Sequence, residues 1–217
     1  MTSVKERLLA GRDAAIAATP VSDWRNGKVP DYHYSNEFMP SQRTFQHAPD
    51  SLEAIVEKVV QIFEMEISFK PDSTQWLSVV QNRFKTRVNG GQDYDAPALS
   101  ERGSYNVLIG DSPFYAASSE SFESSHETFK SAFPKGFFWE VLEVYSPPPV
   151  VTVKWRHWGD FTGTYKGFEP SGKRVEMFGL SVAKLNDDLQ MLEVEHFYDN
   201  NMFLAELTGG CPLANHK

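Results

Sequence analysis

The sequence predicts a single α+β domain, because helical patterns and strand patterns occupy different parts of the chain. In the N-terminal part, apolar residues recur at the spacing of a buried helix face. In the C-terminal part, apolar and polar residues alternate, as in strands that bury one face. At 217 residues with 41% hydrophobic content, the chain is long enough for one domain with a substantial core.

Residues 1–49 are predicted to form a helix and an irregular extension that wraps the core. Residues 3–18 favour a helix, because Ser3 can cap it and Glu6 follows three positions later, as in a capping box. Residues 19–49 contain four prolines, which interrupt regular structure, and several aromatic side chains with apolar surface to bury. We therefore expect the extension to pack against the rest of the chain.

Residues 50–208 are predicted to form the main domain, followed by a C-terminal tail at 209–217. The clearest helix begins after Asp50 or Ser51, either of which can cap it, and ends before Pro71. The other expected elements are helices at 97–109, 119–133 and 200–207 and strands at 137–145, 151–158, 175–183 and 189–199, while residues 76–88 fit either type.

The strands at 151–158 and 175–183 form a predicted hairpin that is central to the fold. One face of the first strand is apolar up to His157, whereas its other face is mostly polar and cationic. The second strand is apolar on both faces, which is typical of a covered central strand. We expect the hairpin to be strongly curved and the face that carries Trp155 to line a cavity.

Composition and motifs exclude several classes of function. The net charge is −8 and the basic residues are scattered, so no positive groove for nucleic acid is expected. Cys211 is the only cysteine, which excludes an internal disulfide and a cysteine zinc site and fits a reducing, cytoplasmic environment. No segment approaches the ~20 apolar residues of a membrane span, and the charged N-terminus is unlike a signal peptide. No metal, phosphate or dinucleotide motif is present, so we expect neither a metal nor another cofactor.

Two motifs on the central hairpin resemble the SnoaL-like pattern of the NTF2-like superfamily. They are Gly-Thr-Tyr-Lys-Gly at 163–167 and Pro-Ser-Gly-Lys-Arg-Val-Glu at 170–176. Within that group the chain is most similar to the plant "pathogen-related" proteins, from about Trp24 to the C-terminus. The resemblance implies an NTF2-like cone, in which a curved antiparallel sheet packs on helices around a pocket. The segments that carry the closer likeness include 133–136, 140–146, 156–159, 197–198 and 210–212.

Asp199 is the first candidate for chemistry. In SnoaL-like cyclases the last strand runs into an aspartate that acts as general acid and base, and Asp199 matches that position. An aspartate directly before a helix is equally suited to cap it. Strand alternation places His196 and Tyr198 on the apolar inner face and Asp199 outside, unless a β-bulge shifts them. The sequence leaves these alternatives open.

His157 and His196 are the other catalytic candidates. His157 ends an apolar strand face, where a neutral imidazole can exchange protons near pH 7 or can be hydrogen-bonded within the core. Glu64, near the end of the long helix, can reach the pocket, although most helix glutamates are solvated. The residues expected to contact a substrate are Trp155, Tyr198, Phe197, Glu195, Glu64, Phe63 and Trp139.

These residues favour a cofactor-independent enzyme that isomerises, cyclises, hydrates or dehydrates a small apolar metabolite by proton transfer. The alternatives are a non-catalytic protein that binds a small molecule in the same pocket, and an accessory protein that dimerises through its sheet. A pocket carboxylate close to a histidine or tyrosine would favour the enzyme. The resemblance also implies a homodimer that pairs through the outer sheet face, where Arg156 and Trp158 would be exposed.

Overall fold

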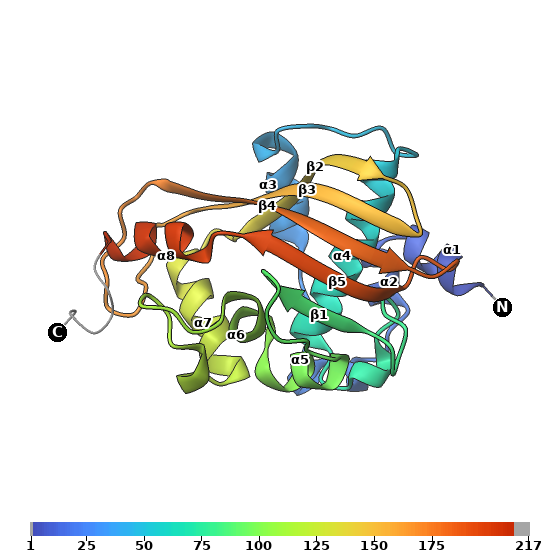
Figure 1. Cartoon of the computed structure of the whole chain (residues 1–217), viewed down its shortest axis with the longest axis horizontal. Coiled ribbons are helices and arrows are strands. Elements are labelled where there is room, and N and C mark those ends of the chain that lie inside the picture. Colours follow the sequence, from blue (N-terminus) through green and yellow to red (C-terminus); the bar gives the residue numbers. More distant parts are fainter. Residues whose placement is uncertain (1, 211–217) are drawn as a thin grey trace.

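The computed structural model describes residues 2–210, so Cys211 and the remainder of the predicted tail lie outside the described residues. Within them, a curved five-stranded sheet packs against helices, which confirms the predicted α+β class (Figure 1). The strand order is β1-β5-β4-β3-β2, in which β1 runs parallel to β5 and the other neighbours are antiparallel. The strands are β1 (Lys85–Val88), β2 (Phe138–Ser146), β3 (Val150–Asp160), β4 (Arg174–Leu185) and β5 (Met191–Tyr198).

Eight α-helices accompany the sheet within residues 2–210. None of these helices is both long and apolar enough to span a lipid bilayer. They are α1 (Val4–Leu9), α2 (Arg12–Ala17), α3 (His33–Gln42), α4 (Leu52–Phe69), α5 (Ala96–Arg102), α6 (Ser104–Ile109), α7 (Phe122–Ala132) and α8 (Asn200–Thr208). Short 3-10 turns lie at Val21–Asp23, Arg25–Gly27, Ser73–Gln75 and Ala117–Ser119.

Two glycines interrupt helices that the sequence predicts as continuous. Gly11 (φ +88°) separates α1 from α2, and Gly103 (φ +89°) separates α5 from α6. Both adopt backbone angles that glycine tolerates and other residues rarely adopt. At Gly103, an added Cβ would also lie 3.2 Å from the ring of Phe122, so the close approach of α7 is a second reason for glycine.

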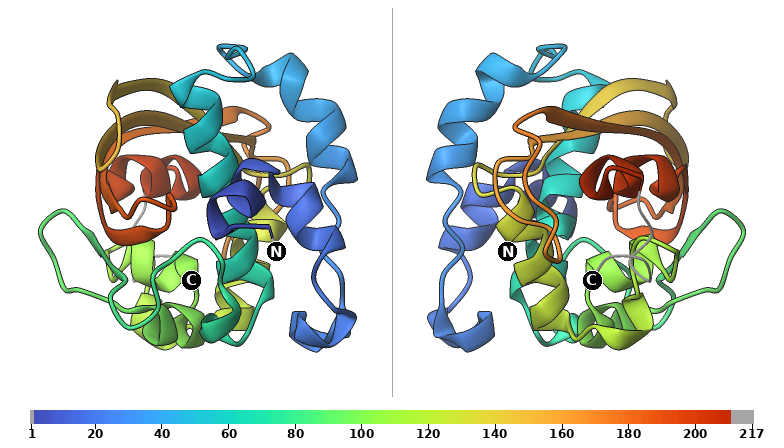
Figure 2. Two further views of the ribbon diagram at one scale, coloured as in Figure 1. Left: turned by 90° about the vertical axis from the view of Figure 1, so that its right-hand side faces the viewer. Right: turned by 90° about the vertical axis from the view of Figure 1, so that its left-hand side faces the viewer.

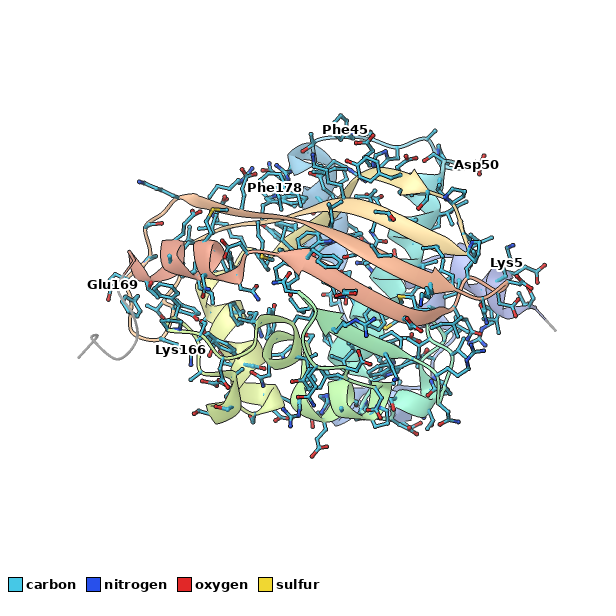
Figure 3. The ribbon with its side chains drawn as sticks, viewed as in Figure 1. Lys5, Phe45, Asp50, Lys166, Glu169 and Phe178 are labelled. Carbon is cyan, nitrogen blue, oxygen red and sulfur yellow. The ribbon has the colours of Figure 1, made fainter. Side chains whose placement is uncertain are left out.

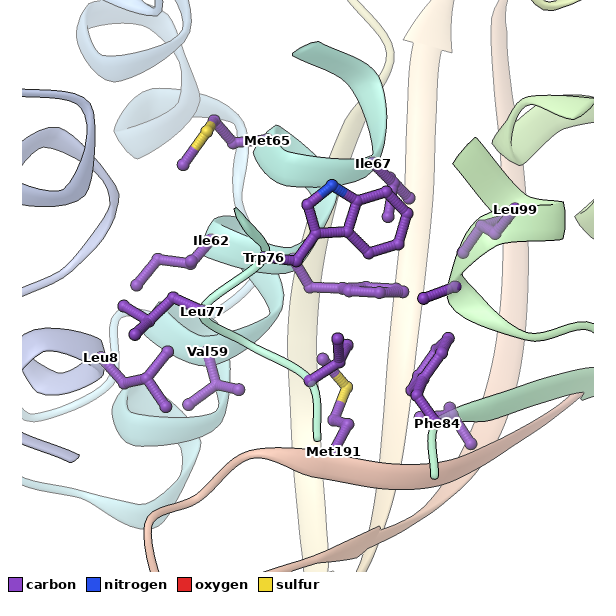
Figure 4. Close-up of a cluster of buried hydrophobic side chains, with 14 of the residues drawn as sticks. Leu8, Val59, Ile62, Met65, Ile67, Trp76, Leu77, Phe84, Leu99 and Met191 are labelled. Atoms are coloured by element: carbon purple, nitrogen blue, oxygen red, sulfur yellow. The ribbon is translucent and has the colours of Figure 1, made fainter. Parts of the chain in front are cut away.

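Helix α4 packs against β2 and against both N-terminal helices. Ser51 caps it by accepting a hydrogen bond from the Ala54 N–H at 3.2 Å. Ile62 and Met65, on its core side, have no exposed surface. Figure 4 shows this side of α4 facing a cluster of apolar side chains from distant parts of the chain. The labelled members of the cluster outside α4 are Leu8, Trp76, Leu77, Phe84, Leu99 and Met191.

The N-terminal extension packs beside α4 (Figure 2). Leu8 and Trp24 are buried in the core that surrounds α4. At its other end, Thr44 donates two hydrogen bonds of 2.8 Å to Glu140 on β2, from its backbone N–H and from its hydroxyl. Glu140 also pairs with Arg156 on β3 at 2.8 Å. The extension is therefore attached to both the helical layer and the sheet, and it contains a helix, α3, where irregular structure was expected.

The outer face of the sheet differs from the expectation in two ways. Trp158 is fully buried rather than exposed, because Phe138 lies 5.6 Å from its ring and Phe38 of α3 packs on Phe138. Conversely, β4 is central but is not covered on both faces. Phe178 projects from its outer face (Figure 3) and is 49% exposed. Leu180, two residues further along β4, is 41% exposed. The extension reaches one end of this face and leaves these side chains open to solvent.

Glu66, on the core side of the last turn of α4, is a fully buried carboxylate. It accepts hydrogen bonds from the backbone N–H groups of Leu77 (2.6 Å) and Ser78 (3.0 Å), and a third from the Ser78 hydroxyl (2.6 Å). Lys70 lies 3.3 Å away and supplies the countercharge. A buried charge persists only when it is paired and hydrogen-bonded in this way, so Glu66 fastens the segment that follows α4 to the helix.

Glu66→Ala should lower the free energy of unfolding by about 3–5 kcal/mol, because it leaves Lys70 buried without its partner and the donors of Leu77 and Ser78 unpaired. Denaturant titration measures this loss. Glu206→Ala, at an exposed position on α8, is the control and should change stability by less than about 0.5 kcal/mol. Equal stability of the two variants would contradict the role given to Glu66.

Candidate active site

A cavity of about 330 Å³ lies between the inner face of the sheet and helices α4, α6 and α7. Its walls are mostly aliphatic and aromatic, from β3, β4, β5 and α4. Among the described residues, Glu64 is the only carboxylate that lines it, and no lysine or arginine does. The other polar or titratable lining side chains are Tyr32, Ser68, Ser104, Tyr105, His126, Trp139, Trp155, His157, Ser181, His196, Tyr198 and Asn200. An apolar cavity with a few convergent polar groups is the usual form of a small-molecule site.

Most of the residues predicted to form the site line this cavity. Those that do are His157, His196, Trp155, Tyr198, Glu64, Phe63 and Trp139. The three that do not are Asp199, Phe197 and Glu195. Glu195 and Phe197 occupy outward-facing positions of β5, and Asp199 follows the end of that strand. Strand alternation therefore explains why these three side chains do not line the cavity.

The pairing of β4 with β5 is regular around the candidate residues. Gly179 pairs with Tyr198, Leu180 with Phe197 and Ser181 with His196, with no register shift among them. The β-bulge that could have turned Asp199 inward is therefore absent from this part of the described sheet. His196 and Tyr198 face the cavity, as simple alternation predicts.

Asp199 caps α8 and lies outside the cavity. Its side chain accepts hydrogen bonds from the N–H groups of Asn201 (2.9 Å) and Met202 (3.1 Å), and the residue is exposed. The structure thus shows the capping alternative, because these two orphan donors at the helix start need an acceptor.

Phe197 and Glu195 are also placed outside, contrary to the expectation that they contact a substrate. Phe197 is 42% exposed on the outer face of the sheet. Glu195 accepts a hydrogen bond from the N–H of Gly90 at 3.0 Å and pairs with Arg87 at 3.1 Å. Glu195 therefore fastens the turn after β1 to β5.

Glu64 lies two residues before Glu66 and faces the cavity instead of the core. Its carboxyl group has no hydrogen-bond partner among the described residues. Burial away from bulk water raises the pKa of Glu64 to about 7, and the positive charge of Arg12 partly offsets that effect. A carboxyl group with this pKa can both accept and donate a proton at neutral pH.

His196 belongs to a hydrogen-bonded chain that begins at Trp155. The indole N–H of Trp155 donates to the Ser181 hydroxyl at 2.8 Å, and that hydroxyl lies 2.8 Å from Nδ1 of His196. Ser181 accepts the hydrogen bond of the indole N–H, and its own hydroxyl can donate to Nδ1 of His196; in that tautomer the imidazole proton lies on Nε2. Burial lowers the pKa of His196 to about 4, so the ring is neutral at physiological pH.

Trp155 occupies its position because β4 carries glycine beside it. A Cβ at Gly179 would lie 2.2 Å from the indole ring. The ring centroid is 5.3 Å from that of Tyr198 and 5.7 Å from that of His157, both in edge-to-face geometry. The indole thus contacts Ser181, His157 and Tyr198, three of the polar residues that line the cavity.

His157 is a neutral histidine in an aromatic environment. Its ring stacks on Phe137 at 4.8 Å between centroids. Burial lowers the pKa of His157 to about 3, while a backbone hydrogen bond with Phe138 acts in the opposite direction. Its Nδ1 is buried and has no hydrogen-bond partner in the part of the chain that the structure describes. His157 can therefore accept a hydrogen bond but does not carry a charge at neutral pH.

Tyr105, His126 and Tyr32 line the cavity and were not predicted. Tyr105 stacks on Phe129 at 4.3 Å, and burial together with the nearby charge of Glu64 raises its pKa to about 12. His126 donates from Nδ1 to the carbonyl oxygen of Phe122 at 2.8 Å, which leaves Nε2 as an unpaired, buried acceptor. The sequence feature that could have indicated His126 is its position on the apolar side of the helix predicted at 119–133.

This arrangement is suited to proton transfer in a mostly apolar site. A carboxyl group with a pKa near 7 is surrounded by neutral hydrogen-bonding groups and by apolar walls, where electrostatic effects are strong. Among residues 2–210, no group of three or more histidine, cysteine, aspartate or glutamate side chains is arranged to hold a metal ion.

The chain has an α+β fold in which a curved sheet and its helices surround an apolar cavity. No family model matches the chain. It is 34% identical over 206 residues to the pathogen-related protein of Hordeum vulgare, and the match covers 88% of each chain. The chain belongs to this family of pathogen-related proteins.

Solved structures similar to the chain share little of its sequence. A candidate SnoaL-like polyketide cyclase from Jannaschia sp. CCS1 has a TM-score of 0.40 and 18% identity, covering 76% of this chain and 97% of that one. An NTF2-like protein from Burkholderia thailandensis has a TM-score of 0.40 and 12% identity, covering 73% of this chain and 97% of that one.

Asp199→Ala should lower the free energy of unfolding by about 1 kcal/mol, because two N–H groups at the start of α8 lose their acceptor. The free energy of unfolding of Asp199→Asn should stay within a few tenths of a kcal/mol of the wild-type value, because asparagine also caps helices well. Thermal or denaturant unfolding compares the two variants. An alanine variant as stable as the asparagine variant would show that the cap contributes nothing.

Proposed function

We propose that this protein is a cofactor-independent proton-transfer enzyme, of the isomerase, cyclase or hydratase type, that acts on a small apolar metabolite. The observation that carries the proposal is Glu64, an unpaired carboxyl group with a pKa near 7 in an otherwise uncharged cavity. An unpaired carboxylate that faces an apolar cavity costs stability, so its presence is best explained by a chemical task. The acid/base role expected of Asp199 is thereby assigned to Glu64.

In the proposed reaction, the ionised Glu64 accepts a proton from a carbon next to a substrate carbonyl group. The electron pair of the broken C–H bond forms an enolate, whose oxygen receives a hydrogen bond from Nε2–H of His196. Glu64 then returns the proton to a different carbon, which isomerises the substrate, or gives it to the alkoxide that forms when the enolate carbon attacks a second carbonyl group of the substrate and closes a ring. A neutral imidazole suits this role, because it donates a hydrogen bond without placing a second charge in the cavity.

The polar side chains around Glu64 would orient the substrate. His157 and His126 each present an unpaired nitrogen that can accept a hydrogen bond from a substrate hydroxyl group. Phe63, Trp139 and Trp155 would contact its apolar rings. The alternative is a protein that binds a small apolar molecule without catalysis. The same apolar walls favour it, and it differs from the enzyme only in that Glu64 transfers no proton.

We also propose that the protein is a homodimer, paired through the outer face of its sheet. Trp158 cannot contribute, since α3 and Phe138 cover it. Phe178, Leu180 and Phe197 support the pairing instead, because they are 41–49% exposed on neighbouring strands and Leu180 pairs with Phe197.

Glu64→Gln should reduce proton transfer ~10²–10⁴-fold, because glutamine keeps the shape but cannot exchange a proton. The measurement is incorporation of solvent deuterium into a panel of apolar ketones, followed by mass spectrometry. Glu206→Gln is the control and should exchange at the wild-type rate. Equal exchange by Glu64→Gln and wild type would exclude Glu64 as the base, and a panel that binds without exchange would favour the binding protein.

Stability supplies a second readout of the same variant. The pKa of Glu64 is raised on folding from about 4.5 to about 7, so ionisation destabilises the folded state as the pH rises through that interval. Glu64→Gln avoids this loss. Its stability relative to wild type should increase between pH 4.5 and 7 and level off above pH 7, at a gain on the order of 2–3 kcal/mol.

Sedimentation at micromolar concentration should show a dimer, and Leu180→Glu should convert it to a monomer, because a charge placed in an apolar interface is costly. Val21→Glu is the control, since Val21 is 58% exposed on the extension, and should leave the dimer intact. A wild-type protein that sediments as a monomer would end the dimer proposal.

A further inference from the structure

The N-terminal extension contributes a wall of the cavity. Tyr32, which precedes α3, lines the cavity together with Glu64. The guanidinium group of Arg12, at the start of α2, lies 3.7 Å from the centre of the Tyr32 ring on the ring face. The edge of Phe69 contacts the same ring, at 6.0 Å between centroids. Tyr32 is thus held between the extension and the last turn of α4.

Arg12 is held in a fixed position. Its side chain is only 12% exposed, and it donates a hydrogen bond from a terminal nitrogen to Oδ1 of Asn36 at 2.5 Å. Asn36 in turn donates to Asp13 at 3.0 Å, which ties α2 to α3. Asp13 lies 3.6 Å from Nε of Arg12, but its side chain is 70% exposed and that Nε has no hydrogen-bond partner. A largely solvated carboxylate neutralises a buried cation weakly.

We propose that Arg12 is a positioning residue for the acid/base group Glu64, acting through its charge and through the Tyr32 wall that it holds in place. This inference rests on the proposed function. It assigns to the N-terminal extension a part of the active site that the main domain alone does not supply.

The charges around Glu64 explain why one arginine can have this effect. Within residues 2–210, Arg12 is the one charged group that shifts the pKa of Glu64, and it favours the ionised carboxylate. The tyrosines that feel the charge of Glu64 in return, Tyr32 and Tyr105, remain neutral because their pKa values are raised. The histidines that line the same cavity stay uncharged, because burial lowers their pKa values. They are His126, His157 and His196.

Two opposing effects therefore set the working pH of the site. Loss of water drives Glu64 toward the protonated form, and Arg12 drives it back toward the carboxylate. Without Arg12, a larger fraction of Glu64 would be protonated at pH 7, and less of the protein would contain the active base. The pH dependence of proton transfer would shift to higher pH, whereas a merely structural contact would leave it in place.

The test is a carbon-13 NMR titration of the Glu64 side-chain carboxyl group in the whole protein, which needs no substrate. We expect a midpoint near 7 in wild type and a rise of about half a unit or more in Arg12→Gln, because the positive charge that favours the Glu64 carboxylate is removed. Arg12→Lys should stay close to wild type. Arg7→Gln, which removes an exposed arginine from α1, is the control and should not move the midpoint.

Asn36→Ala provides a second variant if Arg12→Gln does not fold. Asn36 is exposed on α3, and its side chain accepts the hydrogen bond that holds Arg12 in place. Its removal should raise the titration midpoint of Glu64 by a smaller amount than Arg12→Gln does. A midpoint near 7 that stays unchanged in the folded Arg12 and Asn36 variants would overturn this inference alone. A wild-type midpoint near 4.5 would instead overturn the proposed function, so the two failures are distinguishable.

Discussion

The arrangement of the site depends on the hydrogen bonds that the buried carboxylate of Glu66 accepts. It binds the backbone of Leu77 and Ser78 and thereby fixes how the chain leaves α4 and returns toward β1. Residues two apart on a helix point to nearly opposite sides, so fixing Glu66 in the core directs Glu64 into the cavity. One glutamate is neutralised by three hydrogen bonds and a lysine, and the other is left without a partner. The same turn of helix therefore supplies both the anchor of the fold and its reactive group.

Much of the fold is predictable from local patterns. The cap at Ser51, the long helix that follows it and the strands of the C-terminal half match the structure within a few residues, because burial of one face imposes a period that the sequence must carry. Alternation also places His196 and Tyr198 correctly. The exposed outer face of β4 was not predictable, since Phe178 and Leu180 have the same side chains whether another layer covers them or not. The breaks at Gly11 and Gly103 depend on backbone angles that a single glycine permits but does not require.

The candidate site was harder to predict than the fold. Glu64 and Glu66 both sit in the last turns of one helix, and nothing local distinguishes a solvated glutamate from a paired or an unpaired buried one. That distinction arises from Arg12, Tyr32 and Tyr105, which approach from remote segments. A catalytic role for Asp199 was expected only from a resemblance to SnoaL-like cyclases, whereas a helix start needs an acceptor in any fold. Its two short contacts to Asn201 and Met202 satisfy that need.

The placement of Trp155 gives this cavity a built-in optical signal. The indole is 4% exposed and is held by a hydrogen bond to Ser181, with the Gly179 backbone beside it and the rings of Tyr198 and His157 at its edges. Its emission depends on the polarity and quenching of that small volume, and a molecule entering the cavity changes both. Unlabelled compounds can therefore be screened by native tryptophan fluorescence, and Trp155→Phe identifies which part of the signal comes from Trp155 rather than from the other tryptophans, of which Trp139 also lines the cavity.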